Sequence, residues 1–263
     1  MKSVLVTGAY GGMGQATVRA LRARGFFVFA LDRRVGEPEE QVMPIEADIT
    51  DEQSVARAAE QVKGVTDELF AIVHYAGIYR LDSLVEMDSA SFEGIFRVNL
   101  FGAFLVNRTF LPFLRAGGRI VMTTSELAPL DPLPFTGVYA VTKSALDKYA
   151  YALCMELQLL GISVSVLRAG AVATGMLGVS TDALDRFCAE TKLYRCNADR
   201  FRRIVNRVEA KSVPPEAIAS KMLAILQKKK PAFAYSINRN PLLLLLNILP
   251  RRVQLWAIRR VLR

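Results

Sequence analysis

The feature that most constrains the fold is a glycine-rich turn near the N-terminus. The apolar run Ser3-Val4-Leu5-Val6-Thr7 leads into Gly8, and Gly12 and Gly14 follow before a helical pattern that begins near Gln15. A short apolar run bounded by glycine is typical of a buried parallel strand. Glycines at a strand-to-helix turn let the backbone approach a pyrophosphate, and the helix N-terminus stabilises its charge. The turn therefore predicts a nucleotide-binding α/β domain.

The second apolar run, residues 26–31, ends at Asp32. A carboxylate at this distance from the glycines can accept hydrogen bonds from the adenosine ribose and would repel a 2′-phosphate, which favours NAD. Arg33 and Arg34 follow directly and could bind that phosphate, so NADP stays possible. The third run, residues 43–48, ends at Asp48, which could contact an adenine edge or simply begin a turn.

A tyrosine and a lysine share one face of a helix in mid-chain. Apolar residues recur at helical spacing from Val138 to Leu153, so this stretch predicts an amphipathic helix. Tyr139 and Lys143 are four residues apart and lie one above the other on it. A neighbouring ammonium favours the phenolate and lowers the tyrosine pKa from about 10. A phenol with a lowered pKa can exchange a proton with an alcohol or a carbonyl.

The remaining runs predict further strands at residues 69–73, 119–123 and 163–167 and an edge strand within 231–237. A capping box at Thr50 to Gln53 predicts the start of one helix, and residues 92–111 form another predicted helix, which contains Asn99. Ser125 follows the fifth strand at its carboxyl end, where ligands bind in open α/β sheets.

Composition and charge exclude several classes of function. His74 is the only histidine, and the three cysteines have no metal-ligand spacing, so we expect no metal site and no Ser-His-Asp triad. The net charge is +9, but from Ala217 onward every charged residue is Lys or Arg. Because the basicity belongs to this tail, nucleic-acid binding by the body is disfavoured. No apolar run is long enough to span a membrane.

These motifs together resemble the short-chain dehydrogenase/reductase family over nearly the whole chain. The motifs that carry the resemblance, in order, are Thr7-Gly8-x-x-x-Gly12-x-Gly14, Asp48, Ala76-Gly77, Asn99, Ser125 and Tyr139-x-x-x-Lys143. The resemblance implies one Rossmann domain with a doubly wound, seven-stranded parallel sheet, at residues 1–239. It also implies a cofactor site. The residues assigned to that site are Gly8, Tyr10, Gly12, Met13, Gly14, Asp32, Arg33, Asp48, Ile49, Ala76, Gly77, Tyr139, Lys143, Val172 and Thr174.

The resemblance also implies a role for each catalytic residue. Tyr139 would be the general acid and base, and Ser125 would polarise the substrate oxygen. Lys143 would lower the Tyr139 pKa and bind the nicotinamide ribose, while Asn99 would hold a water that relays protons from Lys143. The spacing from Ser125 to Tyr139 is one residue longer than in the family pattern, which leaves Thr124 as the alternative hydroxyl.

Two loops depart from the family pattern. The family's Asn-Asn-Ala-Gly is His74-Tyr75-Ala76-Gly77 here, without either amide, and the Pro-Gly after the sixth strand is Ala169-Gly170. Gly77 still permits close approach of a cofactor. The loss of both amides puts the support of the first loop in question.

Residues 175–211 form an excursion too long for an ordinary connection, which predicts a substrate lid. Its apolar side chains predict a bulky apolar substrate: Leu177, Val179, Leu184, Phe187 and Leu193. With the leucine-rich tail, they make the chain similar to family members that act on steroids, bile acids or retinoids. A hydroxysteroid dehydrogenase is the first expectation. The alternatives are a retinol dehydrogenase, a ketoacyl carrier-protein reductase or a regulatory protein that senses nucleotides.

The C-terminal segment, residues 240–263, combines five consecutive leucines with a basic amphipathic stretch. Wound as a helix, the basic stretch has the pattern of an interfacial membrane helix. Burial over the substrate cleft or against another subunit is the preferred prediction, with at most peripheral membrane contact. We expect a cytoplasmic homodimer or homotetramer.

Overall fold

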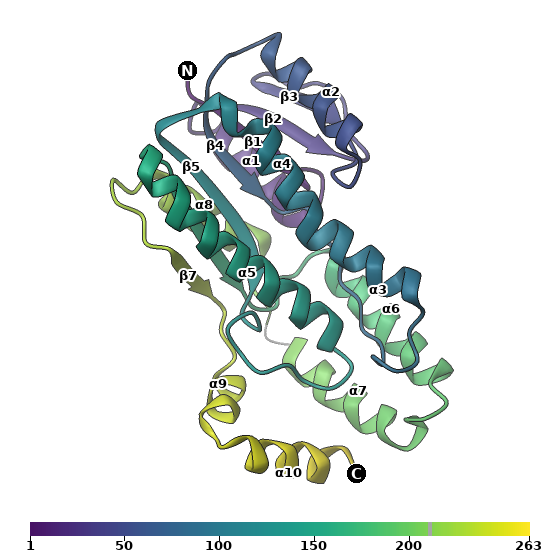
Figure 1. The fold of residues 1–263 in the computed structure, drawn as a ribbon. Coiled ribbons are helices and arrows are strands. Elements are labelled where there is room, and N and C mark those ends of the chain that lie inside the picture. The colour runs from purple at the N-terminus through teal and green to yellow at the C-terminus, as the bar shows by residue number, and fades with distance from the viewer. Residues whose placement is uncertain (210–211) are drawn as a thin grey trace.

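Seven parallel strands form the centre of this computed structural model, which describes residues 1–209 and 212–263, without the side chains of 176–181 and 206–209 (Figure 1). The strands are β1 Ser3–Thr7, β2 Phe27–Asp32, β3 Val42–Glu46, β4 Leu69–His74, β5 Leu114–Ser125, β6 Ser163–Ala169 and β7 Ala234–Ile237. Their order in the sheet is β3-β2-β1-β4-β5-β6-β7. The direction of winding reverses between β1 and β4, so a crevice is expected at their carboxyl ends. The predicted doubly wound sheet is confirmed.

Helices cover both faces of the sheet because successive strand residues point to opposite sides. Leu5 packs in the cluster under α2 (Glu52–Lys63), α4 (Gly102–Phe110) and α5 (Gly137–Leu157). Val4 and Val6 pack in the cluster under α1 (Gly12–Arg22) and α8 (Pro215–Gln227). These three strand side chains are fully buried. The two clusters hold the carboxyl edge of the sheet in place from both sides.

The excursion after β6 forms two helices, α6 (Gly175–Glu190) and α7 (Arg195–Glu209). They enclose a third and smaller core with residues from the loops after β4 and β5. Its buried members are Leu81, Phe135, Leu184, Phe187, Ala198 and Phe201. The prediction that Leu193 lies against the substrate is wrong, because its side chain is 68% exposed. The side chains of Leu177 and Val179 lie outside the described part of the chain.

The C-terminal segment forms α9 (Pro241–Ile248) and α10 (Arg251–Leu262) at the end of the molecule opposite α2 (Figure 1). Residues of both helices are hydrogen-bonded to loops at the carboxyl edge of the sheet. Across the described residues, none of the helices combines the length and apolar character needed to span a bilayer.

Two local predictions differ from the structure. The capping residue of α2 is Asp51, whose carboxylate accepts a hydrogen bond from the Gln53 backbone nitrogen at 3.0 Å, so Thr50 does not cap the helix. The single helix predicted over 92–111 begins earlier, with α3 at Ser89–Phe96, and is interrupted by a π-helical turn at Arg97–Phe101 before α4. Side-chain contacts of Asp48 and Asn99 account for both differences, as the site geometry shows.

Candidate active site

A cavity of about 260 Å³ lies at the carboxyl ends of the central strands. It brings together predicted residues from five separate parts of the chain. These are Met13 from α1, Gly77 after β4, Ser125 at the end of β5, Tyr139 and Lys143 on α5, and Val172 and Thr174 after β6. The cavity is therefore the candidate site for both cofactor and substrate.

Ser125, and not Thr124, is the hydroxyl beside the tyrosine. The Tyr139 hydroxyl is hydrogen-bonded to the Ser125 side chain. Thr124 Oγ1 donates instead to Asp147 Oδ1, at 3.2 Å. The alternation of a β-strand turns consecutive side chains to opposite sides, so the two hydroxyls cannot both reach Tyr139. The extra residue between Ser125 and Tyr139 therefore does not change which hydroxyl lies beside the tyrosine.

Lys143 is buried below the tyrosine on the same helix. Its Nζ lies 5.7 Å from the Tyr139 ring centroid and donates a hydrogen bond to the Thr123 carbonyl oxygen at 3.2 Å. Burial disfavours the ammonium and lowers the pKa of Lys143 to about 8. Lys143 is thus protonated at neutral pH and loses its charge on moderate alkalinisation.

The expected lowering of the Tyr139 pKa is wrong for this structure. Burial of the phenol raises the pKa of Tyr139 above its ordinary value, the nearby Tyr79 raises it further, and only the hydrogen bond to Ser125 acts to lower it. Desolvation is the largest cause of this shift, and burial also disfavours the ammonium of Lys143. Tyr139 consequently holds its proton as a general acid over the whole neutral range.

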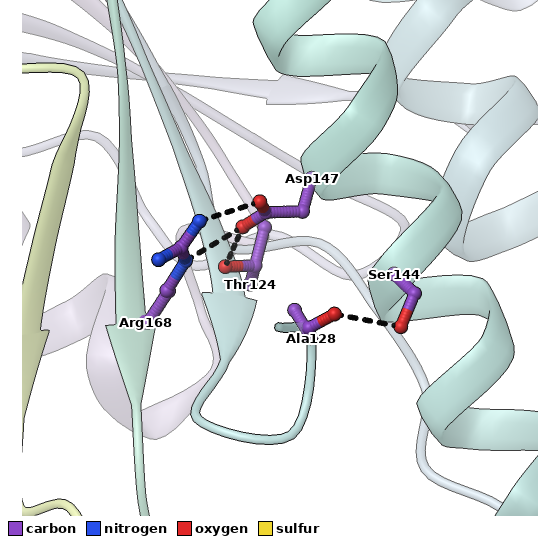
Figure 2. Close-up of polar contacts among 5 residues, drawn as sticks. All are labelled: Thr124, Ala128, Ser144, Asp147 and Arg168. Atoms are coloured by element: carbon purple, nitrogen blue, oxygen red, sulfur yellow. Dashed lines mark hydrogen bonds and ion pairs between the residues drawn. The ribbon is translucent and has the colours of Figure 1, made fainter. Parts of the chain in front are cut away.

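A network of polar contacts fixes α5 against the sheet (Figure 2). Arg168 on β6 donates two hydrogen bonds to the Asp147 carboxylate, from Nε at 3.0 Å and from Nη2 at 2.7 Å. One turn earlier on α5, Ser144 Oγ donates to the Ala128 carbonyl oxygen at 2.8 Å, which anchors the loop after Ser125 (Figure 2). These contacts set the position of the helix that carries Tyr139, and no pattern in the sequence predicted them.

Asn99 occupies the π-helical turn and is buried. Its Oδ1 accepts a hydrogen bond from the Ile78 nitrogen at 2.8 Å, and its Nδ2 donates to the Ile78 carbonyl oxygen at 3.0 Å. The same Nδ2 lies 3.1 Å from Thr142 Oγ1, next to Lys143. The amide thus ties the loop after β4 to α5. Its water-relay role stays a prediction.

The loop that lacks the family's two amides is supported by other side chains. His74 Nε2 is hydrogen-bonded to Asn107 Oδ1 at 2.8 Å, and the Tyr75 hydroxyl to Thr17 Oγ1 at 2.7 Å. Burial lowers the pKa of His74 to about 4, so the imidazole is neutral at physiological pH. The two larger side chains therefore reach partners on α4 and α1 that the shorter amides could not reach.

The glycine-rich turn packs closely against neighbouring loops because its glycines have no side chain. Gly8 has a φ of +67°, and a Cβ there would lie 2.5 Å from the Ala76 nitrogen. A Cβ on Gly12 would lie 2.7 Å from Thr174 Cγ2, so the turn and the loop after β6 already meet. These residues fit NAD(P), whose pyrophosphate needs exposed backbone nitrogens at a helix N-terminus.

The carboxylate predicted for the adenosine ribose lies beside this turn. Asp32 Oδ2 accepts a hydrogen bond from the Tyr10 nitrogen at 3.0 Å, and Oδ1 accepts one from the Arg33 nitrogen at 2.7 Å. Asp48 Oδ1 accepts hydrogen bonds from the nitrogen and hydroxyl of Thr50, at 2.8 and 2.7 Å, so it does form a turn. Ile49 is buried behind it. Contacts of Asp48 and Ile49 with adenine stay predictions.

Several residues of the cavity were missed in the sequence. Tyr79 places its ring centroid 4.9 Å from that of Tyr139. Glu126 accepts a hydrogen bond from the Asn240 nitrogen at 2.5 Å and so ties the C-terminal segment to the loop after β5. The apolar wall includes Leu133, Phe201, Ile204, Val205 and Leu243. Helical periodicity marks the α7 residues as apolar, but it cannot tell which of them face a cavity.

Comparisons with known proteins identify the family of this chain. A sequence model described as short chain dehydrogenase matches residues 2–185. The uncharacterized oxidoreductase YbbO of Escherichia coli (strain K12) is 31% identical over 96% of this chain and 92% of its own. Estradiol 17-beta-dehydrogenase 2 of Mus musculus is 32% identical over 70% of this chain and 51% of its own.

The fold recurs in a solved structure. A short chain dehydrogenase from Burkholderia cenocepacia J2315 in complex with NADP has a TM-score of 0.76, with 23% identity and full coverage of both chains. The family match spans the glycine-rich turn, Ser125, Tyr139 and Lys143, which are the residues gathered at the cavity. With its Tyr-Lys helix beside a nucleotide turn, this chain belongs to the short-chain dehydrogenase family and is an NAD(P)-dependent oxidoreductase.

Proposed function

We propose that the protein interconverts a secondary alcohol and a ketone on a bulky apolar substrate, with a hydroxysteroid (a steroid or a bile acid) as the first candidate. The observation that carries the proposal is the lining of the cavity. Among the described lining residues only Glu126 and Lys143 bear a formal charge, and α7 and α9 supply aliphatic and aromatic side chains. Such a wall favours an apolar ring system and gives a sugar or a phosphate few polar partners.

The chemistry follows from the positions of the hydroxyls. In alcohol oxidation, the Tyr139 oxygen takes the hydroxyl proton while the carbinol carbon loses a hydride. Ser125 donates a hydrogen bond to the substrate oxygen and holds it beside Tyr139. Bound NAD(P) supplies or accepts the hydride. Lys143 would bind the nicotinamide ribose through its ammonium, and Asn99 would hold a water that relays protons from Lys143.

In the reverse direction Tyr139 donates its proton to the ketone oxygen. The raised pKa of Tyr139 suits this step, because the phenol stays protonated at neutral pH. A protonated phenol suits ketone reduction, whereas alcohol oxidation requires the phenolate form of Tyr139.

A screen of substrates with NADH fluorescence tests the proposal. Purified protein is assayed with steroid, retinoid, acyl and sugar alcohols and with the matching ketones, alongside Tyr139→Phe as a blank. We expect the highest kcat/KM with steroid or retinoid substrates. A preference for sugar alcohols, or turnover that Tyr139→Phe retains, would contradict it. The 17-beta-dehydrogenase named above is similar to this chain, which supports placing steroids first.

For the cofactor we infer a preference for NAD over NADP. The Asp32 carboxylate lies at the edge of the glycine-rich turn, where it can accept hydrogen bonds from the ribose and would repel a 2′-phosphate. Asp32→Ala should shift the ratio of kcat/KM toward NADP by about tenfold or more, because Arg33 and Arg34 remain to bind the phosphate. Equal efficiency with both cofactors in the unmodified protein would refute the inference.

We also infer a cytoplasmic homodimer or homotetramer. Exposed apolar side chains on the π-helical turn, α4 and α5 support self-association: Phe101, Phe104, Val141, Tyr151 and Met155. Phe104→Glu should reduce the mass measured by sedimentation velocity. Arg57→Glu, on the exposed side of α2, is the control and should leave the mass unchanged.

A further inference from the structure

The C-terminal helices α9 and α10 are docked firmly on the molecule. The Asp131 nitrogen donates a hydrogen bond to Asn247 Oδ1 at 2.6 Å, and Gln254 Nε2 donates to Asp131 Oδ2 at 3.3 Å. At the far end, Asn197 Nδ2 on α7 donates to the Leu262 carbonyl oxygen at 2.7 Å. These contacts determine which faces of the two helices point outward.

The outward face of α9 is apolar although it is exposed. Leu242, Leu245 and Ile248 lie three residues apart on one face and are 70%, 59% and 78% exposed. Leu243, on another face of the same helix, lines the catalytic cavity. One helix thus separates the cavity from a contiguous apolar surface, which is unusual for a helix that faces only water.

The outward face of α10 is basic and carries an aromatic anchor. Arg252, Arg259 and Arg263 fall on one side of this helix, and all three are exposed. Trp256, beside them, is 66% exposed. The neighbouring α7 carries a further exposed arginine, Arg200. Arginines, exposed leucines and a tryptophan together match the interface of an anionic bilayer.

A second copy of the chain fits this surface poorly. In a two-fold symmetric dimer the same patch meets itself, so arginines of α10 would face arginines of the partner. No Asp or Glu occurs from Ala217 to the end of the chain to compensate these charges within the two helices. An anionic lipid surface supplies both the apolar layer and the opposite charge.

We propose that α9 and α10 form a docking surface for an anionic lipid bilayer, with the exposed leucines of α9 inserted at the headgroup boundary and the arginines of α10 on lipid phosphates. Docking in this way places the cavity wall formed by Leu243 next to the acyl chains. An apolar substrate would then enter from the membrane, a consequence that rests on the proposed function. The docking itself does not depend on it.

The single tryptophan of the chain makes the surface directly observable, because Trp256 reports on α10 alone. The full-length protein is mixed with vesicles of phosphatidylcholine containing phosphatidylglycerol, and with vesicles of phosphatidylcholine alone. We expect a blue shift of the emission, quenching by brominated lipid and salt-sensitive co-sedimentation, all with the anionic vesicles only. No blue shift and no co-sedimentation with anionic vesicles would overturn the proposal.

Matched variants distinguish vesicle binding by this surface from binding that depends only on the net positive charge of the protein. Arg252→Glu combined with Arg259→Glu should lower the partition coefficient at least about tenfold. Arg57→Glu combined with Lys63→Glu makes the same change in net charge on α2, at the opposite end of the molecule, and should lower it far less. Equal losses in the two double variants would refute the proposal, and melting temperature and NADH affinity check that each variant is folded.

A third comparison tests the apolar face and the alternative partner. Leu245→Gln combined with Ile248→Gln should weaken binding to anionic vesicles, whereas Leu159→Gln combined with Leu160→Gln, at two similarly exposed leucines after α5, should not. If the α9 variant instead lowered the oligomer mass without changing vesicle binding, this face would be a subunit interface and the proposal would be wrong. Tyr139→Phe should bind vesicles normally, so failure of the proposed reaction does not count against docking.

Discussion

The two parts of this molecule differ in how they are held together and in what they supply. We call residues 1–174 and 212–239 the body, and residues 175–209 and 240–263 the cap. The body has two large buried clusters on the faces of the sheet, and Ser125, Tyr139 and Lys143 all belong to it. The cap contributes to a small third cluster and exposes large apolar side chains of α9 and α10 to solvent.

The proposed catalytic residues and part of the apolar cavity wall therefore come from different parts of the chain. The family match ends at residue 185, so it covers most of the body and only the first part of the cap. Part of the apolar cavity wall is formed by residues that all lie beyond that point: Phe201, Ile204, Val205 and Leu243. The family model therefore identifies the reaction class, while this part of the cavity wall lies outside the residues that the model matches.

The test with the largest expected effect removes the proposed proton donor, which belongs to the body. Tyr139→Phe keeps the ring that packs at 4.9 Å against Tyr79 but removes the proton. We expect turnover to fall by roughly 10³-fold with cofactor affinity nearly unchanged. Steady-state kinetics and NADH titration measure the two effects. A variant that retained a tenth of the activity would show that the proton donor lies elsewhere.

The next test compares an ion pair of the body with one of the cap. Asp147→Ala leaves Arg168 without its two hydrogen bonds in a largely buried place, and should lower the free energy of unfolding by about 2 kcal/mol. Asp185→Ala breaks the exposed contact with Arg202 in the cap and should leave the urea midpoint unchanged. Urea unfolding followed by circular dichroism measures both. Equal effects would remove the distinction between the two parts.

A smaller effect is expected from widening the cap side of the cavity. Ile204→Ala removes part of the apolar wall without touching Ser125, Tyr139 or Lys143. We expect kcat/KM for an apolar substrate to change by about tenfold, with NADH affinity unaltered. Thr174→Ala is the counterpart on the cofactor side, and NADH affinity should respond there first. A shift of NADH affinity in Ile204→Ala would mean that the cap also shapes the cofactor site.

The smallest expected effect is a pH dependence that belongs to the body. The pKa of Lys143 is lowered to about 8, so its ammonium is present below pH 8 and is lost above it. NADH affinity should stay constant from pH 6 to about 8 and fall by a few-fold above it. Lys143→Arg should remove this dependence, since arginine stays charged. A change centred near pH 6 in fluorescence titration would point to another group, and it would not be His74, whose pKa is about 4.

Local patterns in the sequence predicted most of the fold. The seven strands lie within a few residues of the predicted runs, because a buried parallel strand needs a continuous apolar stretch. The excursion after β6 was predicted as an insertion, but its division into α6 and α7 was not. The π-helical turn around Asn99 could not be predicted, because contacts with Ile78 and Thr142, remote in the sequence, compensate its irregular backbone.

For the site, the sequence alone was enough to predict the features that depend on short-range geometry. The glycine-rich turn and the Tyr139–Lys143 spacing act within one turn of chain or one helix face, so their arrangement follows from local backbone structure. The features that depend on residues distant in the sequence became visible in the tertiary structure. Thr124 is hydrogen-bonded to Asp147, and Ser125 is the hydroxyl beside Tyr139. Burial raises the pKa of Tyr139, and Leu243 of α9 lines the cavity. Desolvation and packing depend on residues that are far apart in the chain, so a local sequence pattern does not predict them.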